Sequence, residues 1–293
     1  MKTFKKFTLL LLSFVLLLLC WGCEKQEPQE SSVEEAQSRE EKTDFSVTFA
    51  SEGGIAFSKL LVYIYEEGNS DDLVWAGETD DMGRVSFKAD PSKKYNAVIK
   101  NLPEGYEAKE NYPLDGENTQ LVFKTVLSPV DDLSAVKYKL GSVAGDFKIT
   151  DCNGTEYEIS KLLETKKAIV LNFWFLNCQP CRMEFPFLQQ AYEDHKDDIQ
   201  VIALNPYDGT DKTVSQYASE LGLTFPVASC DADWQTAMNL TAYPTTVVID
   251  RYGTIAMVHK GSVTDKETFV KVFEFFASDN YKQTTIKNLS EIQ

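Results

Sequence analysis

The chain has 293 residues, more than the roughly 100–200 of one ordinary domain, so its length favours two domains. A composition that is 43% hydrophobic and 25% charged is typical of globular proteins. The 45 acidic side chains outnumber the 29 basic ones and give a net charge of −16. A surface this acidic repels phosphate backbones, so we expect no nucleic-acid partner.

The N-terminus carries an export signal. Three lysines among the first six residues precede the apolar run Phe7–Leu19, which is shorter than the roughly 20 residues of a membrane-spanning helix. This pattern predicts a signal peptide over 1–22. Gly22 directly before Cys23 resembles the bacterial lipobox, which implies that Cys23 is lipidated. An uncleaved N-terminal anchor is the alternative, and either one predicts an extracytoplasmic protein anchored to the cell membrane as a lipoprotein or by its own terminus.

The segment 23–43 is predicted to be a disordered tether that starts at the lipidated cysteine. Glu24–Thr43 holds seven glutamates and three basic residues, with almost nothing apolar to bury. Outside the cytoplasm disulfides can persist, which makes the remaining cysteines important. After Cys20 and Cys23 are set aside, four are left: Cys152, Cys178, Cys181 and Cys230.

Residues 44–126 are predicted to form an all-β sandwich. Short alternating runs such as Tyr95–Ile99 are separated by turn clusters such as Asp81-Met82-Gly83. The stretch from Thr79 through Tyr106 resembles Cna-B-type and related transthyretin-like sandwich domains. It contains no histidine or cysteine, which predicts a spacer or partner-binding module rather than a catalytic domain.

After a connector over 127–140, the pattern changes to alternating strands and helices. The stretch 141–280 begins with a hairpin around the Cys152 turn. The uninterrupted apolar run Ala168–Phe175 predicts a strand buried on both faces. The elements expected after it are a helix at Cys181–His195, a strand at Ile199–Leu204, a helix at Asp211–Leu221, a strand at Phe225–Ala228, a hairpin at Thr245–His259 and a helix at Asp265–Phe276, followed by a C-terminal tail over 281–293.

The Cys178-Gln179-Pro180-Cys181 motif carries the chemistry. A lone pair of this spacing can be half of a zinc site, a structural loop or a redox pair. Zinc needs four ligands, and the chain offers no second pair and only two histidines, at unrelated spacings. Cys178 lies where a buried strand gives way to a helix, and a helix N-terminus favours the thiolate. We therefore expect Cys178 to be an exposed nucleophile and Cys181 the resolving thiol.

The segment Asn172–Pro186 resembles the active-site segment of the TlpA/ResA family of thioredoxin-like proteins, and Tyr243-Pro244-Thr245-Thr246 resembles the proline loop of that fold. The resemblance covers about 135 residues. It implies a thioredoxin fold with an N-terminal hairpin extension, a redox-active disulfide between Cys178 and Cys181, and a cis bond before Pro244. Tyr243, Pro244 and Trp174 are the candidate substrate-binding residues, although Trp174 on an apolar strand is also typical of a core residue.

Glu184 is the candidate acid–base residue. Thioredoxins carry a buried aspartate six residues before the first active cysteine, and this chain has Asn172 there. Glu184, one helical turn after Cys181, coincides with a glutamate that the TlpA/ResA family carries near its sulfurs. A carboxyl buried among apolar neighbours has a raised pKa and can exchange protons with a thiol. A solvated surface glutamate is the alternative.

The sequence thus predicts a membrane-anchored thiol–disulfide oxidoreductase without cofactor or metal. The resemblance implies that it reduces disulfides of exported client proteins, apocytochromes c in cytochrome c maturation among them, with electrons from a CcdA-type membrane thiol carrier. The alternatives are a disulfide-forming oxidase, a peroxiredoxin-like peroxidase and a non-catalytic surface-binding module. Nothing in the sequence brings Cys152 and Cys230 together, so both are expected to be free thiols, with a structural disulfide between them as the alternative.

Overall fold

A computed structural model describes residues 41–208 and 210–292. The predicted signal peptide, the lipidation site Cys23 and all but the last residues of the predicted tether lie outside this part of the chain. Within the described ranges, no helix combines the length and the apolar character needed to cross a bilayer.

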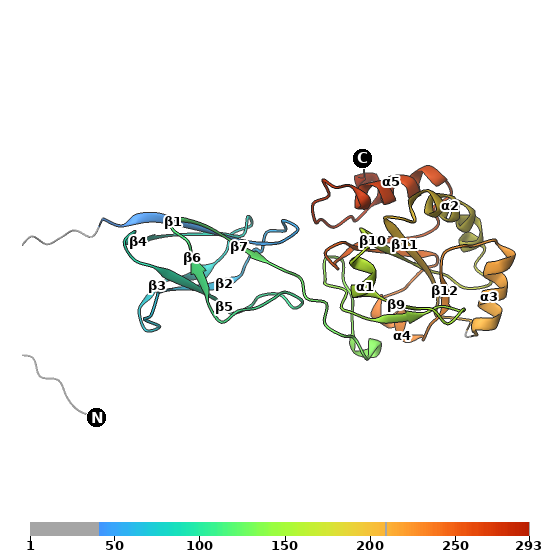
Figure 1. Cartoon of the computed structure of the whole chain (residues 1–293), viewed down its shortest axis with the longest axis horizontal. Helices are drawn as coiled ribbons and strands as arrows, with labels where there is room; N and C mark the ends of the chain where they lie inside the picture. The colour runs from blue at the N-terminus through green and yellow to red at the C-terminus, as the bar shows by residue number, and fades with distance from the viewer. Residues whose placement is uncertain (1–40, 209, 293) are drawn as a thin grey trace, which may run out of the picture. The chain divides into compact units, whose positions relative to one another are not determined.

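The N-terminal region consists of two facing β-sheets (Figure 1). In the first, β1 lies between β4, to which it is antiparallel, and β7, to which it is parallel. In the second, all pairings are antiparallel and the order is β3-β2-β5-β6. The strands are β1 (Thr43–Ser51), β2 (Leu61–Glu66), β3 (Leu73–Glu78), β4 (Arg84–Ala89), β5 (Tyr95–Ile99), β6 (Tyr112–Leu114) and β7 (Asn118–Phe123).

An aromatic core joins these sheets, as the alternating pattern predicts. Along β4, buried Val85 and Phe87 alternate with exposed residues. Phe87 stacks on Phe45 with ring centroids 5.4 Å apart, and Tyr95 meets Phe45 edge-on. Strand β1 begins at Thr43, the last residue of the expected tether.

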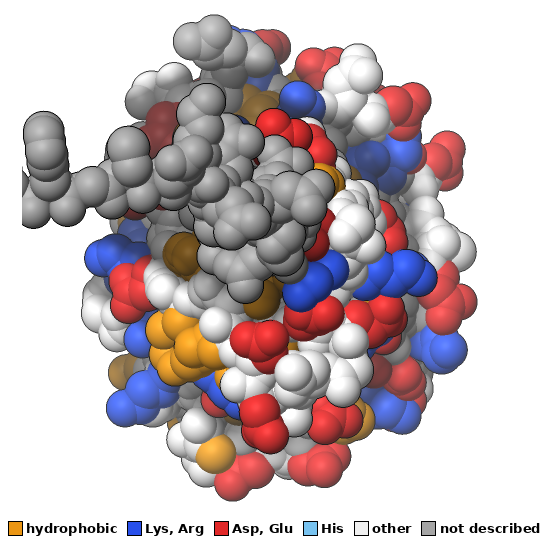
Figure 2. Space-filling model, turned by 90° about the vertical axis from the view of Figure 1, so that its left-hand side faces the viewer, with side chains coloured by type: hydrophobic (Ala, Val, Ile, Leu, Met, Phe, Trp, Pro, Cys, Tyr) orange, Lys and Arg blue, Asp and Glu red, His pale blue; other side chains and the backbone are white. Residues whose placement is uncertain are grey.

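Figure 2 shows acidic and basic side chains interspersed over one face of the molecule.

The C-terminal region is a five-stranded mixed sheet with helices on both faces (Figure 1). The strand order is β12-β11-β10-β13-β14, with β10 parallel to β11 and antiparallel to β13. A two-stranded hairpin of β8 (Lys148–Thr150) and β9 (Glu156–Glu158) precedes it. The other elements are α1 (Ile159–Leu163), β10 (Ala168–Phe173), α2 (Gln179–His195), β11 (Ile199–Asn205), α3 (Asp211–Glu220), β12 (Val227–Ser229), α4 (Asp233–Ala237), β13 (Thr245–Asp250), β14 (Ile255–Lys260) and α5 (Lys266–Ala277), with single 3₁₀ turns at Leu133–Ala135 and Leu289–Glu291.

The period-two alternation of β10 divides its side chains between two cores. Val170 and Trp174, which follows the strand, pack in one core with α2, α3 and α5. Leu171 and Phe173 pack in the other, with α1 and α4. Covering both faces of the sheet explains why every residue of β10 is buried.

Two features have no counterpart in the sequence-based expectations. Helices α1 and α4 were not expected, because five residues are too few to show helical periodicity. The expected C-terminal tail packs onto the domain. Tyr281, Ile286 and Ile292 are buried, and the Ile286 N–H donates to the Ala256 carbonyl at 2.7 Å. Their irregular spacing gives no periodic signal.

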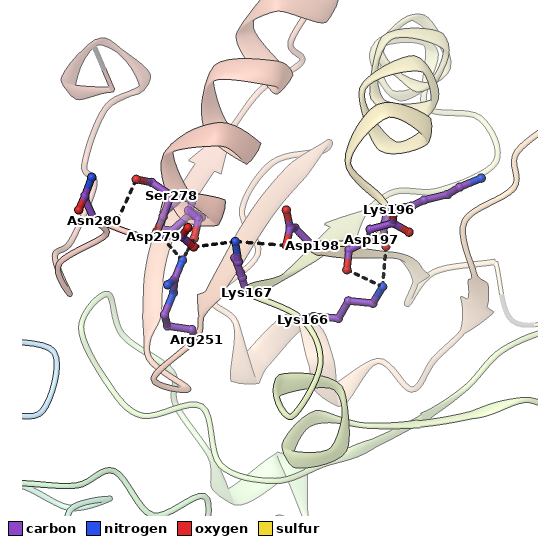
Figure 3. Close-up of polar contacts among 10 residues, drawn as sticks. Lys166, Lys167, Lys196, Asp197, Asp198, Arg251, Ser278, Asp279 and Asn280 are labelled. Atoms are coloured by element: carbon purple, nitrogen blue, oxygen red, sulfur yellow. Dashed lines mark hydrogen bonds and ion pairs between the residues drawn. The ribbon is translucent and has the colours of Figure 1, made fainter.

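Basic side chains bind backbone carbonyls at the end of the sheet where β10 begins, away from Cys178 (Figure 3). The Arg251 guanidinium donates to the carbonyls of Phe276 and Ser278, at 2.8 and 2.7 Å, and so satisfies the C-terminal end of α5. Lys166 likewise donates to the carbonyls of Lys196 and Asp197, just after α2. These contacts fix the C-terminal ends of α5 and α2, two of the helices that cover one face of the sheet.

Candidate active site

Cys178 is the N-cap of α2. Strand β10 ends at Phe173, and five residues lead to the first residue of the helix. The Cys178 Sγ accepts a hydrogen bond from the Cys181 N–H at 3.2 Å. The first N–H groups of a helix have no partner within the helix, and the helix dipole adds partial positive charge there. A thiolate at Cys178 is therefore stabilised where it lies.

A disulfide joins Cys178 to Cys181, with the two Cα atoms 5.3 Å apart. Cys178 is only 2% exposed and Cys181 is fully buried. The expectation that Cys178 is an exposed nucleophile is therefore wrong for this oxidised form. The cause is apolar cover: both sulfurs belong to the core cluster on the α2 face, against which Phe175 and Tyr243 pack.

The backbone before Cys178 is fixed by the loop after β11. The Leu176 N–H donates to Asp208 Oδ2 at 2.5 Å. The same carboxylate oxygen accepts a bond from Asn205 Nδ2 at 3.0 Å, and Asn205 Oδ1 in turn accepts from the N–H groups of Tyr207 and Asp208. Asn205 is fully buried, so this loop is tied both to the sheet and to the reactive segment.

Phe175, three residues before Cys178, contacts two other aromatic side chains. The Phe175 ring lies 5.4 Å from Tyr243 in an edge-on contact and 5.4 Å from Tyr207 in a tilted one. Tyr207 is 67% exposed, so the cluster runs from the core that contains the sulfurs to the surface.

The three candidate substrate-binding residues lie at different depths. Trp174 is fully buried, stacks on Tyr217 and meets Phe185 edge-on, so it supports the core and cannot touch a client. The peptide bond between Tyr243 and Pro244 is cis. Pro244 is buried, whereas Tyr243 is partly exposed.

Glu184 is buried one turn after Cys181. Its carboxylate accepts two hydrogen bonds, from Asn172 Nδ2 to Oε1 at 2.8 Å and from the Val263 N–H to Oε2 at 2.7 Å. Burial raises the pKa of Glu184 to about 7, and the two donors oppose this rise. The alternative of a solvated surface glutamate is wrong, because the side chain is fully buried.

Cys152 and Cys230 are free thiols in this structure. Cys152 packs against the core on the α2 face, and its Sγ lies 3.8 Å from Asp211 Oδ1. Cys230 packs against the core on the opposite face of the sheet.

A disulfide at the N-terminus of the helix after the central strand of this mixed sheet, together with a cis-proline just before the neighbouring strand β13, defines a thiol–disulfide oxidoreductase with a thioredoxin fold. The AhpC/TSA family model matches residues 140–258. The thioredoxin-like protein YneN of Bacillus subtilis is 34% identical over 130 residues, which cover 43% of this chain and 75% of that protein.

Two proteins named thiol-disulfide oxidoreductase ResA are equally similar. The one from Geobacillus kaustophilus is 34% identical over 131 residues, covering 44% of this chain and 73% of that protein. The one from Bacillus subtilis is 34% identical over 129 residues, covering 43% and 69%. The C-terminal half of this chain therefore belongs to the ResA-type thioredoxin-like thiol–disulfide oxidoreductases.

Sequence reasoning missed several residues that shape the site. Asp208 and Asn205 carry no motif, and their link to Leu176 depends on loop geometry. Val263 contributes only a backbone N–H. Thr246 stood in the quoted proline-loop motif, but only the pairing of β13 with β10 places it opposite Asn172.

Proposed function

We propose that this chain reduces disulfides of exported client proteins, with Cys178 as the attacking thiol, Cys181 as the resolving thiol and Glu184 as the proton carrier. The observation that carries the proposal is the position of Cys178 as the N-cap of α2, in a disulfide with Cys181, which lies one turn before the buried Glu184.

The reaction transfers two electrons. In the reduced enzyme, the Cys178 thiolate attacks one client sulfur, which forms a mixed disulfide and expels the other client sulfur as a thiolate. Cys181, once deprotonated, attacks Cys178 Sγ and releases the second client thiolate. The enzyme disulfide forms while the client disulfide becomes two thiols.

The proton on Cys181 needs an acceptor inside the protein, because that sulfur is fully buried. Glu184 lies on the same helix, three residues further on, and faces the same core. A carboxyl whose pKa is raised to about 7 accepts and returns a proton near neutral pH. Glu184 then protonates a departing client thiolate.

The aromatic cluster of Phe175, Tyr207 and Tyr243 is the proposed contact surface for clients, together with Pro244. Phe175 lies three residues before Cys178 and, like Tyr243, packs against the core that contains the two cysteines, while Tyr207 is exposed. These positions support the three rings as the surface that a client meets. Aromatic side chains bury large apolar areas and suit many polypeptides. Trp174 is not part of this surface because it is fully buried.

The cellular setting is part of the proposal. The N-terminal sequence supports export and lipidation at Cys23, with the β-sandwich over 44–126 as a spacer or partner-binding module. The resemblance to TlpA and ResA makes apocytochrome c the first client to test and a CcdA-type membrane thiol carrier the electron donor that restores the dithiol.

The reduction potential of the Cys178–Cys181 pair, measured by equilibration with glutathione, tests the direction of electron flow. A reductant should lie near thioredoxin, at about −270 mV, because the more negative couple donates electrons. A value near about −120 mV, typical of strongly oxidising members of the fold, would contradict the proposal and favour an oxidase. Turnover of hydroperoxide by Cys178 without a disulfide client would favour the peroxidase alternative.

A further inference from the structure

Asn172 occupies a buried position between the proposed proton carrier and the proline-loop strand. Its Nδ2 donates to Glu184 Oε1 at 2.8 Å and to Thr246 Oγ1 at 3.1 Å, so both amide hydrogens are used. Asn172 lies directly opposite Thr246 in the pairing of β10 with β13. Asn172, Thr246 and Glu184 are each at most 2% exposed.

The other end of the amide is unsatisfied. Asn172 Oδ1 is buried, and no atom of the described residues donates to it. A buried carbonyl oxygen without a donor is costly, so its orientation needs a reason. The reason is the charge of Glu184: an ionised carboxylate can only accept hydrogen bonds, and therefore it selects the NH₂ end of the amide.

Protonation of Glu184 reverses this preference. A protonated carboxyl keeps one acceptor oxygen and gains an O–H that must donate. Oε2 faces the Val263 N–H, which needs the acceptor, so the O–H falls on Oε1, toward an Asn172 NH₂ that offers no lone pair. Turning the amide over places Oδ1 toward Glu184 and Thr246. Oδ1 has two lone pairs, one for the Glu184 O–H and one for the Thr246 O–H, and a hydroxyl can either donate or accept.

We infer that Asn172 is a positioning residue that holds Glu184 in both of its protonation states by turning its side-chain amide over. In either orientation, the end of the amide that faces Glu184 and Thr246 makes two hydrogen bonds and the other end makes none. The inference rests on the proposed role of Glu184, and it explains what an amide does where thioredoxins carry a carboxylate.

The surroundings of Glu184 leave Asn172 as the side chain that responds. Its environment within the described residues consists of burial, the Asn172 amide and the Val263 N–H, and no charged side chain contributes. Val263 is a backbone donor on the loop after β14 and cannot reverse its polarity. Cys181, one turn earlier on α2, is the titratable neighbour from the same helix and is held in the disulfide in this form.

The direct test is a pH titration of the oxidised full chain, isotope-labelled and held in detergent, by nuclear magnetic resonance. The Glu184 carboxyl carbon reports protonation. The nuclear Overhauser effect between the Asn172 amide hydrogens and the Thr246 side chain reports orientation. We expect this effect above the Glu184 midpoint and its loss below it, with one shared midpoint. An effect that persists at every pH would overturn the inference.

Asn172→Leu provides a second measurement. A fixed donor stabilises only the ionised form, so its removal should raise the Glu184 midpoint by about one to two pH units. An amide that bonds both forms predicts a rise of less than about one unit, because part of the stabilisation cancels. Thr246→Val, which keeps the shape and removes the hydroxyl, is the matched control and should also shift the midpoint little. A rise of about two units in Asn172→Leu alone would show a fixed donor.

Glu184→Gln separates this inference from the proposed function. If disulfide exchange by the Glu184→Gln protein keeps the wild-type pH profile, Glu184 has no acid–base role. The Asn172 amide then has no catalytic role either. If the profile changes while the Asn172 amide keeps one orientation in the wild type, only the inference fails.

Discussion

Replacing Glu184 by Gln should make the stability of the thioredoxin-like domain less dependent on pH. Burial raises the pKa of Glu184 from 4.5 to about 7. As the pH rises between these values, the unfolded chain has already lost its proton while the native chain keeps it. The native state therefore binds more protons, and stability falls with rising pH. A shift of this size corresponds to about 3 kcal/mol, because one pKa unit is about 1.4 kcal/mol.

The glutamine side chain carries no charge at any pH and therefore avoids this loss. Relative to the wild type, the Glu184→Gln protein should gain about 3 kcal/mol of stability between about pH 4 and about pH 8.5. The assay is urea unfolding of the oxidised proteins, followed by hydrogen–deuterium exchange in peptides from β10, which report this domain alone. A stability difference that stays constant with pH would refute a buried, titrating Glu184.

Three further predictions concern structure around the site. Arg251→Ala should destabilise the domain by about 2–4 kcal/mol in urea unfolding, since it removes two charge-assisted bonds and a cation–π contact. Lys167→Ala, which removes ion pairs of a partly exposed side chain, should cost less than about 1 kcal/mol. Equal effects would contradict this. Asp208→Ala should slow disulfide exchange by about ten-fold without unfolding, because it frees the backbone before the reactive pair. Cys152 and Cys230 should both be alkylated in the denatured, unreduced protein, and failure of both to react would reveal a bridge.

The periodic spacing of apolar residues predicted most of the strands and helices. The apolar run at Ala168 and the alternation around Tyr95 lie where β10 and β5 are found, because burial on two faces or one face leaves a direct mark on the sequence. Helices α1 and α4 leave no such mark because each is barely longer than one turn. The packing of the segment after α5 depends on isolated apolar residues, and no local pattern predicts where they dock.

The reactive pair was predictable because its spacing and its place after a buried strand are local features. Its burial was not, since the core cluster to which both cysteines belong is built largely from side chains distant in sequence. The hydrogen bonds to Glu184 come from Asn172, twelve residues earlier, and Val263, 79 residues later. Such partners are set by how the sheet and its loops close around α2, which spacing along the chain does not report.

Trapping of client disulfides tests the central claim most directly. Full-length Cys181→Ser and Cys178→Ser proteins, in reduced form, are mixed with a disulfide-bonded client and examined on non-reducing gels. The Cys181→Ser protein should accumulate a mixed disulfide through Cys178, because no second thiol resolves it. The Cys178→Ser protein should accumulate none through the reactive pair, since Cys181, the remaining thiol of that pair, is fully buried. A mixed disulfide formed equally by both proteins, or only through Cys181, would contradict Cys178 as the attacking thiol.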